Sequence, residues 1–362
     1  MDILKEVLRY NSISIIGNYK NVGKTTTLNY ILKVILKYNT HQRCTKEVAN
    51  KTRGYITLGL TSIGVDGENN DIITKTKKPR IYVSKGTLIA TAKSCVISSD
   101  ISKEILEASD INTPLGNVII FRSLSDGYIE LAGPSINSQI KYICERLKSY
   151  GANLSIVDGA LSRKTLGSPS ITEGTIFCSG AILNKDMSKS IEQIVYEANI
   201  LNTSNIEEAK FLEIYQNIKE YKISLVNKDY TYEILNISTT LNCYKEVYDS
   251  INDNTKYVVM NGILTNNFIE NLIRSGDKYK NVTILIIDST KIFLDKEIYD
   301  KFIKLNGRIK VINKLNLIGI SINPTSINGY SFDEEQFIDR IQSKTKLNVF
   351  NVMKYKIQQQ KF

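Results

Sequence analysis

The sequence predicts an α/β protein in which a P-loop NTPase domain with a mostly parallel sheet is followed by a second, smaller α/β domain. One observation is a strand, a Gly-rich turn, Gly-Lys-Thr and an amphipathic helix within residues 12–38. The other is that apolar strand-like runs alternate with helical segments along the chain, and that this pattern restarts near Thr203. The expected domains are therefore residues 1–202 and 203–362.

Length and composition are those of a globular protein. The chain has 362 residues, enough for roughly two domains, and 42% of them are hydrophobic and 23% charged. No apolar run approaches the ~20 residues of a membrane span. The segment Met1–Tyr10 predicts the start of an amphipathic helix rather than a signal peptide, because Asp2, Lys5 and Glu6 interrupt it. We expect a cytoplasmic protein without a membrane segment.

The first strand and helix enclose the strongest motif. Ser12–Ile16 is a β-branched apolar run that predicts a buried strand, and Leu28, Ile31, Leu32 and Ile35 recur at helical spacing. Between them lies a loop whose backbone N–H groups would face a phosphate at a helix N-terminus. The residues expected to bind the nucleotide are Gly17, Asn18, Tyr19, Lys20, Asn21, Val22, Gly23, Lys24, Thr25 and Thr26.

Each residue type of this motif has a chemical reason. Gly23 keeps side chains away from the phosphates, Lys24 reaches the terminal phosphates as a catalytic residue, and the Thr25 hydroxyl can bind Mg²⁺. The alternative is an ordinary Gly-containing turn between strand and helix. Gly17 and Gly23 enclose five residues rather than four, so that Asn18 occupies the place of the usual first Gly. This longer loop resembles that of the dethiobiotin synthetase-like branch of P-loop proteins.

Two acidic residues are candidate metal ligands. Leu154–Val157 predicts a buried strand that ends in Asp158, the arrangement in which a carboxylate binds Mg²⁺. Asp66 lies in the acidic loop after the predicted strand Tyr55–Leu60, where ligands of parallel sheets bind, and is a candidate catalytic or metal-binding group. For both residues the alternative is a solvated turn.

The segments around Asp158 predict further elements. Ser99–Ser109 predicts a short helix, and Asn117–Pro134 predicts two β runs joined as a hairpin by Ser-Asp-Gly. Ser135–Gly151 predicts an amphipathic helix, and Glu173–Asn202 predicts a strand followed by a long helix.

Several classes of chemistry are disfavoured. The five cysteines are scattered and the chain has one histidine, so a Cys/His metal site or a Ser-His-Asp mechanism is not expected. The net charge of +10 is spread along the chain, and its one compact basic run is Thr74–Arg80. Because no aromatic residues interleave with a basic face, nucleic acid is disfavoured as a partner.

The sequence favours ATP over GTP. Guanine is read by the carboxylate of an Asn-Lys-x-Asp motif, and Met187 stands at the required Asp of the Asn184-Lys-Asp-Met segment. The expected cofactors are therefore ATP and Mg²⁺.

Several stretches together resemble the P-loop subunit of lysine 5,6-aminomutase reactivase. They are residues 13–31, 60–92, 154–164 and 321–333. The resemblance implies a Mg²⁺-dependent ATPase that helps to exchange damaged cobalamin on an adenosylcobalamin-dependent lysine 5,6-aminomutase. It also implies a second subunit that resembles the ATPase MutS. In this reading Lys24 holds the β- and γ-phosphates, and Thr25 and Asp158 hold Mg²⁺.

Two alternatives from other classes stay open. One is an ATP-dependent ligase like dethiobiotin synthetase, which shares the loop length and the acidic-Gly-Ala sequence that begins at Asp158. The other is a nucleotide-gated scaffold that hydrolyses ATP very slowly. The sequence also leaves open whether two copies pair across the nucleotide as a homodimer.

Overall fold

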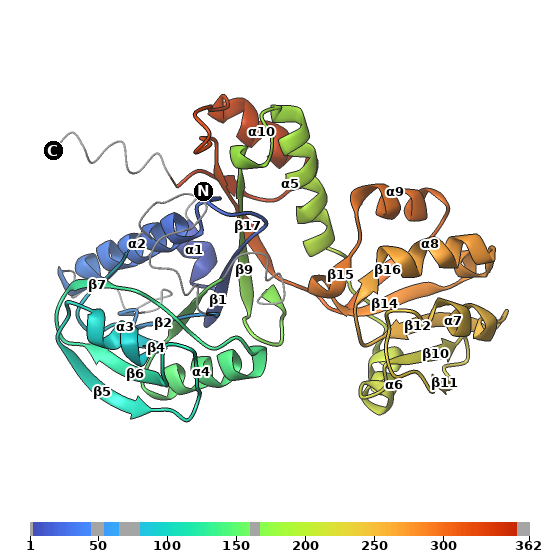
Figure 1. Ribbon diagram of the computed structural model, residues 1–362, viewed down its shortest axis with the longest axis horizontal. Coiled ribbons are helices and arrows are strands. Elements are labelled where there is room, and N and C mark those ends of the chain that lie inside the picture. Colours follow the sequence, from blue (N-terminus) through green and yellow to red (C-terminus); the bar gives the residue numbers. More distant parts are fainter. Residues whose placement is uncertain (1–2, 45–53, 65–79, 160–166, 353–362) are drawn as a thin grey trace. The chain divides into compact units, whose positions relative to one another are not determined.

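The structure is a computed structural model of the 362-residue chain, and it describes residues 3–44, 54–64, 80–159 and 167–352. The chain forms two compact units (Figure 1). One contains Met1–Ala198 and Asn316–Phe362, and the other contains Asn199–Leu315. The chain thus leaves the first unit and returns to it, so that the second unit is an insertion.

A nine-stranded sheet forms the centre of the first unit. The strands from β18 to β4 all pair in parallel, whereas β6 and β5 add antiparallel pairs at one edge. The predicted α/β class with a mostly parallel sheet is confirmed. In sheet order the strands are β18 (Val349–Phe350), β17 (Leu317–Asn323), β9 (Gly174–Gly180), β1 (Ser12–Gly17), β8 (Leu154–Asp158), β2 (Leu58–Ser62), β4 (Leu88–Ala92), β6 (Val118–Ser123) and β5 (Lys103–Ala108).

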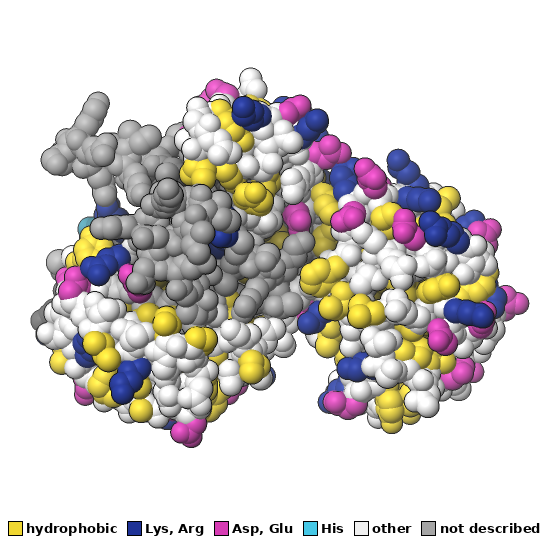
Figure 2. All heavy atoms as spheres, in the orientation of Figure 1, with side chains coloured by type: hydrophobic (Ala, Val, Ile, Leu, Met, Phe, Trp, Pro, Cys, Tyr) yellow, Lys and Arg dark blue, Asp and Glu magenta, His cyan; other side chains and the backbone are white. Residues whose placement is uncertain are grey.

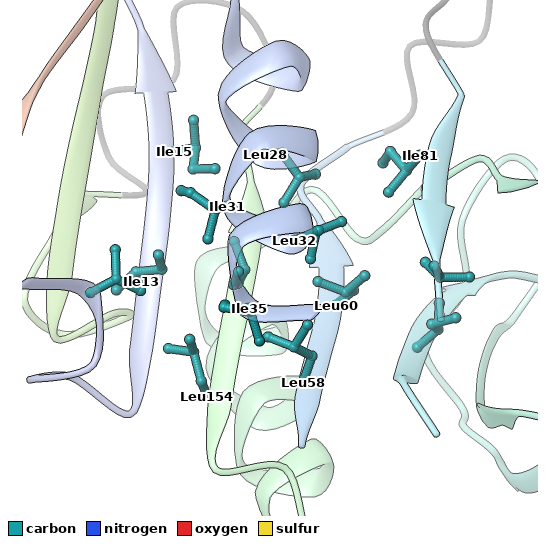
Figure 3. Close-up of a cluster of buried hydrophobic side chains, with 14 of the residues drawn as sticks. Ile13, Ile15, Leu28, Ile31, Leu32, Ile35, Leu58, Leu60, Ile81 and Leu154 are labelled. Atoms are coloured by element: carbon teal, nitrogen blue, oxygen red, sulfur yellow. The ribbon is translucent and has the colours of Figure 1, made fainter. Parts of the chain in front are cut away.

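Helices cover both faces of this sheet. On one face Ile13 and Ile15 pack with Leu28 and Ile31 of α2 (Lys24–Cys44) (Figure 3). Ile3 and Val7 of α1 (Ile3–Val7) belong to the same core. On the other face, α4 (Asn137–Ser149) packs its buried apolar residues against β4 and β6. Each fully buried Leu or Ile contributes about 1.5–3 kcal/mol relative to an exposed one. A parallel sheet needs this double cover because both of its faces are apolar.

Shorter elements complete the first unit. The helix α3 (Lys93–Ser98) follows β4, and α10 (Glu334–Thr345) lies between β17 and β18. Outside the main sheet, β3 (Ile81–Val83) pairs antiparallel with β7 (Gly127–Ile129). The 3₁₀ turn η2 (Ala181–Leu183) leads from β9 into α5 (Met187–Leu201). At the end of α5 the chain enters the inserted unit.

The inserted unit has its own sheet and core. Its strand order is β11-β10-β12-β14-β16. The pairs β12–β14 and β14–β16 are parallel, whereas β10 pairs antiparallel with both β11 and β12. Phe211 and Ile218 of α6 pack against Val259 and Leu285 of the sheet. The elements are α6 (Ala209–Ile218), β10 (Ile223–Asn227), β11 (Tyr232–Leu235), α7 (Tyr244–Ser250), β12 (Thr255–Met260), β13 (Leu264–Thr265), α8 (Asn266–Ser275), η3 (Lys278–Asn281), β14 (Thr283–Asp288), η4 (Ser289–Lys291), β15 (Ile292–Phe293), α9 (Lys296–Lys304) and β16 (Ile309–Asn313).

The structure divides the chain differently from the expected boundary at residues 202 and 203. Residues 316–352 belong to the first unit, because β17 pairs with β9 and β18 pairs with β17. The restart of the pattern near Thr203 marks the beginning of an insertion of α/β structure. The end of the insertion has no comparable signal in the sequence, because β17 has the same apolar pattern as the strands before it.

The helix predicted for residues 99–109 is wrong, and so is the hairpin predicted for residues 117–134, although both of its β runs form, as β6 and β7. The expected helix is the edge strand β5, in which pairing with β6 overrides local helix propensity, with a register shift between Ile105 and Glu107. The expected hairpin does not form, because β6 pairs with β4 and β5 whereas β7 pairs with β3. Asp126, in the turn between them, accepts a hydrogen bond from the Lys85 backbone N–H at 2.7 Å and so directs the chain toward β3.

Candidate functional site

Residues 17–26 form the turn that joins β1 to α2, and we call them the 17–26 loop. Gly17 ends β1, and α2 begins at Lys24. Gly23 has a φ of +94°, a left-handed conformation that glycine adopts without strain. The Thr27 N–H and hydroxyl both donate to the Gly23 carbonyl oxygen, at 2.8 and 2.9 Å, and close the first turn of the helix.

Gly17 allows the end of β1 and the Lys24 side chain to approach closely. A Cβ added at Gly17 would lie 2.7 Å from Val22 Cγ2, 3.2 Å from Lys24 Cδ and 3.2 Å from the Cys178 carbonyl oxygen. The aliphatic part of Lys24 therefore folds back over the end of β1 instead of extending away from the loop. This placement keeps the ammonium group of Lys24 with the loop that precedes it.

The start of α2 is a favourable place for an anion. The first N–H groups of a helix have no partner within it, and their dipoles give a positive potential at this end. The helix is 21 residues long, with Lys24 at its first position. Together the N–H groups and the ammonium group can bind a phosphate.

The other loop residues have different surroundings. The Asn18 Oδ1 accepts a hydrogen bond from Ser179 Oγ at 3.0 Å, and its Nδ2 is buried with no partner among the residues that the structure describes. Tyr19 is 52% exposed, Asn21 is exposed with a φ of +58°, and Val22 is buried. The loop therefore contains a buried amide donor, Asn18 Nδ2, that has no partner among the described residues.

Asp158 ends the strand next to β1. It lies in register with Ile15, and the Gly159 N–H donates to the Ile15 carbonyl oxygen at 3.0 Å. Leu154 and Ile156 of the same strand belong to the core on the α2 side of the sheet, so that Asp158 shares this side. The predicted strand that ends in a carboxylate is confirmed, and it is adjacent to the strand that enters the 17–26 loop.

The buried thiol of Cys178, on β9, contacts Thr27 of α2 and is close enough to Lys24 and Asp158 to feel their charges. Burial raises its pKa to about 11, and the charge of Asp158 acts in the same direction. The hydrogen bond with Thr27 and the charge of Lys24 lower the pKa in part. The thiol is therefore neutral at pH 7, and Cys178 is a packing residue beneath the loop.

The last residues of β17 and the residues that follow this strand also belong to this region. The Ser321 and Thr27 hydroxyls are 2.8 Å apart, and a Cβ on Gly23 would lie 3.9 Å from Asn323 Cβ. The Tyr330 hydroxyl donates to the Ala181 carbonyl oxygen at 2.6 Å, which fixes the chain beyond β17 to the end of β9. The signal in the sequence is a strand that ends in a loop rich in Asn, Ser and Thr, which is weak by itself.

The donors in this region fit a Mg²⁺-nucleotide. Mg²⁺ prefers oxygen ligands and keeps several waters, so that one carboxylate and one hydroxyl of the protein are sufficient. Asp158 would supply the carboxylate, and Thr25, in the first turn of α2, would supply the hydroxyl. Within the described ranges no group of three or more His, Cys, Asp or Glu residues could hold a metal ion. Asp66 lies outside the described residues.

Charge and hydropathy add two observations. On the face drawn in Figure 2, Lys and Arg side chains are interspersed with Asp and Glu side chains. Of the basic run Thr74–Arg80, only Arg80 lies within the described residues. The helices in the described part of the chain include none with the length and apolar character needed to cross a membrane.

Comparison with protein-family profiles, curated proteins and solved structures gave no match to the chain.

Proposed function

We propose that this protein binds ATP with Mg²⁺ at the 17–26 loop and hydrolyses it. The observation that carries this proposal is the approach of Lys24 to Gly17 at the start of a 21-residue helix. This approach brings together the Lys24 ammonium group and the N–H groups at the start of the helix. Gly17 and Gly23 leave the turn between them without side chains at those two positions. These are the groups that bind terminal phosphates in P-loop proteins. The nearby Asp158 supports the metal part of the proposal.

The roles of the residues follow from their chemistry. Lys24 holds the β- and γ-phosphates, and its charge offsets the negative charge that develops on the transferred group. Thr25 and Asp158 hold Mg²⁺, which neutralises phosphate charge when bound. The Asn18 Nδ2, which is buried and has no partner among the described residues, is placed in the loop as a further donor.

ATP is favoured over GTP. Met187 begins α5, at the place where a guanine-reading motif needs a carboxylate. Asn184 is engaged locally, since its Oδ1 accepts a hydrogen bond from the Asp186 N–H at 2.9 Å. The segment after β9 therefore lacks the carboxylate that would read guanine, and its Asn184 side chain is already hydrogen-bonded within the segment.

The resemblance to the reactivase subunit suggests the biological process that ATP hydrolysis serves. We propose that ATP turnover loosens an adenosylcobalamin-dependent lysine 5,6-aminomutase, so that damaged cobalamin exchanges for intact cofactor. In this proposal the MutS-like ATPase subunit is the second component. The inserted unit 199–315 is then available for contacts with these partners.

Nucleotide binding is tested first. A fluorescent ATP analogue is titrated with Mg²⁺ against the wild type, Lys24→Ala and Lys37→Ala. Lys37 is an exposed lysine of the same helix, and its removal controls for net charge. Loss of a charge-assisted hydrogen bond removes about 1.5–3 kcal/mol, so Lys24→Ala should bind about 10- to 140-fold more weakly. Equal affinity of all three proteins contradicts the proposed site.

Function is tested by reconstitution. Purified protein, ATP, inactivated aminomutase, the MutS-like subunit and fresh adenosylcobalamin are mixed, and recovered mutase activity is measured with wild type and Lys24→Ala. Recovery with the wild type alone supports a reactivase. Phosphate release that depends on a small carboxylate and needs no partner protein indicates a ligase. Nucleotide binding without hydrolysis in the complete mixture indicates a scaffold.

A further inference from the structure

The end of β2 carries a hydroxyl beside the acidic strand end. Ser62 is in register with Asp158 of β8, and Asp158 is in register with Ile15 of β1. Neighbouring strands lie about 4.8 Å apart, so that these residues form one row across three strands. In this row Asp158 lies between Ile15 and Ser62, so Ser62 is one strand farther than Asp158 from the strand that enters the 17–26 loop.

The Ser62 side chain shares a face with Asp158. Leu58 and Leu60 of β2 point toward α2, as Leu154 of β8 does (Figure 3). Alternate residues of a strand share a face, which places Ser62 on the α2 side of the sheet. The residue is only 7% exposed, and within the described ranges its hydroxyl makes no hydrogen bond. The hydroxyl is not among the fully buried side-chain atoms that lack a partner, so a water or a ligand can reach it and supply the hydrogen bond.

The backbone around Ser62 is held on two sides. The Ile63 N–H donates to the Asp158 carbonyl oxygen at 3.0 Å, and the Gly64 N–H donates to the Pro134 carbonyl oxygen at 2.8 Å. A Cβ on Gly133 would lie 1.7 Å from the Ser62 carbonyl oxygen, so the 133–134 segment packs directly on the end of β2. The backbone of Ser62 is thus fixed in place before any ligand binds.

We propose that Ser62 is a positioning residue of the metal site, whose hydroxyl holds a water of the Mg²⁺ hydration shell beside Asp158. This inference rests on the proposed function. Mg²⁺ bound by few protein groups keeps several waters, and those waters need fixed acceptors or donors. Hydrogen bonds to groups around a metal set its affinity, and their removal typically lowers metal affinity 10- to 100-fold.

The test measures how nucleotide binding depends on Mg²⁺. Binding of the fluorescent ATP analogue is titrated with Mg²⁺ for the wild type, Ser62→Ala, Ser62→Thr and Thr61→Val. Ser62→Ala should need at least about tenfold more Mg²⁺ for half-maximal effect, with unchanged affinity in the absence of Mg²⁺. Ser62→Thr keeps the hydroxyl and should restore the dependence. Thr61→Val removes the neighbouring hydroxyl, on the α4 side of the same strand, and should leave the dependence unchanged.

The outcomes separate this inference from the proposed function. A wild type that binds no ATP overturns the proposed function. ATP binding with the same Mg²⁺ dependence in Ser62→Ala overturns the inference and leaves the nucleotide site intact. Weakening that is equal with and without Mg²⁺ also overturns it, because the hydroxyl would then act on the nucleotide or the fold. As a second measurement, Ser62→Ala should add little to the Mg²⁺ requirement of Asp158→Asn, since both act through one metal.

Discussion

The hydroxyl groups of Thr27 and Ser321 are 2.8 Å apart, although the two residues are separated by 294 positions in the chain. Thr27 donates to the Gly23 carbonyl oxygen, so Ser321 is the donor to Thr27. The Cys178 thiol donates to the same Thr27 oxygen at 3.5 Å. The first turn of α2 is therefore tied to β9 and to β17, the strand that follows the inserted unit.

Removing the Ser321 hydroxyl should loosen the start of α2. The bond contributes about 0.5–1.5 kcal/mol, so Ser321→Ala should raise local opening by about 2- to 12-fold. Hydrogen exchange measured by mass spectrometry on peptides that cover residues 23–28 reports this opening. Ser343→Ala, on the exposed side of α10, removes a hydroxyl from the same C-terminal segment and should leave the exchange unchanged. Equal exchange in both variants would show that the Ser321 bond does not hold the helix.

A methyl group at Gly17 should displace the loop. The added Cβ would lie 2.7 Å from Val22 Cγ2, and Val22 is buried, so that the loop or the Lys24 side chain has to move. Gly17→Ala should therefore weaken ATP binding at least about tenfold while far-UV circular dichroism stays unchanged. Gly54→Ala is the matched control, because a Cβ at Gly54 meets nothing within 4 Å. A Gly17→Ala protein with wild-type affinity would contradict the proposed role of this close approach.

The local part of the site could be predicted from the sequence, because its signals lie within one strand, one turn and one helix. Ser12–Ile16 and the spacing of Leu28, Ile31 and Leu32 specify β1 and α2 with nearby residues only. Asp158 was also predictable, since a buried strand that ends in a carboxylate is visible in sequence. That β8 lies next to β1 is a fact of sheet order, which short-range patterns do not encode.

The part of the site that comes from distant segments could not be predicted, because short-range patterns do not encode which strands become neighbours. Ser321 and Asn323 reach the loop only because β17 pairs with β9 across an inserted unit. Ser62 gains its place beside Asp158 through strand register, which the sequence of β2 alone does not specify. In β5, sheet pairing overrides local propensity. Its Lys-Glu-Ile-Leu-Glu-Ala sequence favours a helix, but the segment forms a strand.

The inserted unit should fold alone. It has its own sheet, and its core of Phe211, Val259 and Leu285 lies within Asn199–Leu315. A protein of residues 199–315 should show a cooperative thermal transition by circular dichroism. A shorter protein of residues 199–306 lacks β16, which pairs with β14, and should not show one. An unfolded 199–315 protein would mean that the unit depends on the rest of the chain.

Glu208 joins the start of α6 to the sheet of the inserted unit. Its Oε2 accepts hydrogen bonds from Lys256 Nζ and from the Tyr230 hydroxyl, both at 2.8 Å, and its Oε1 accepts one from the Tyr257 hydroxyl at 2.7 Å. The Lys256 ammonium group, followed by the Tyr257 hydroxyl, lowers the pKa of the Glu208 carboxyl from 4.5 to about 2. The charged carboxylate is thus stabilised by folding.

This shift predicts how acid affects the inserted unit. Because the pKa of Glu208 is lower in the folded than in the unfolded state, its contribution to stability is complete above pH 4.5 and is lost as the pH falls toward about 2. Glu208→Gln should therefore destabilise the unit at pH 7 and differ less from the wild type near pH 2. Hydrogen exchange of peptides from α6 and β12 across this pH range measures the difference. Glu213→Gln alters an exposed carboxylate of the same helix and should leave the pH dependence of exchange in these peptides as in the wild type. A Glu208→Gln effect of the same size at pH 7 and pH 2 would show that packing, not the carboxylate charge, holds α6 to the sheet.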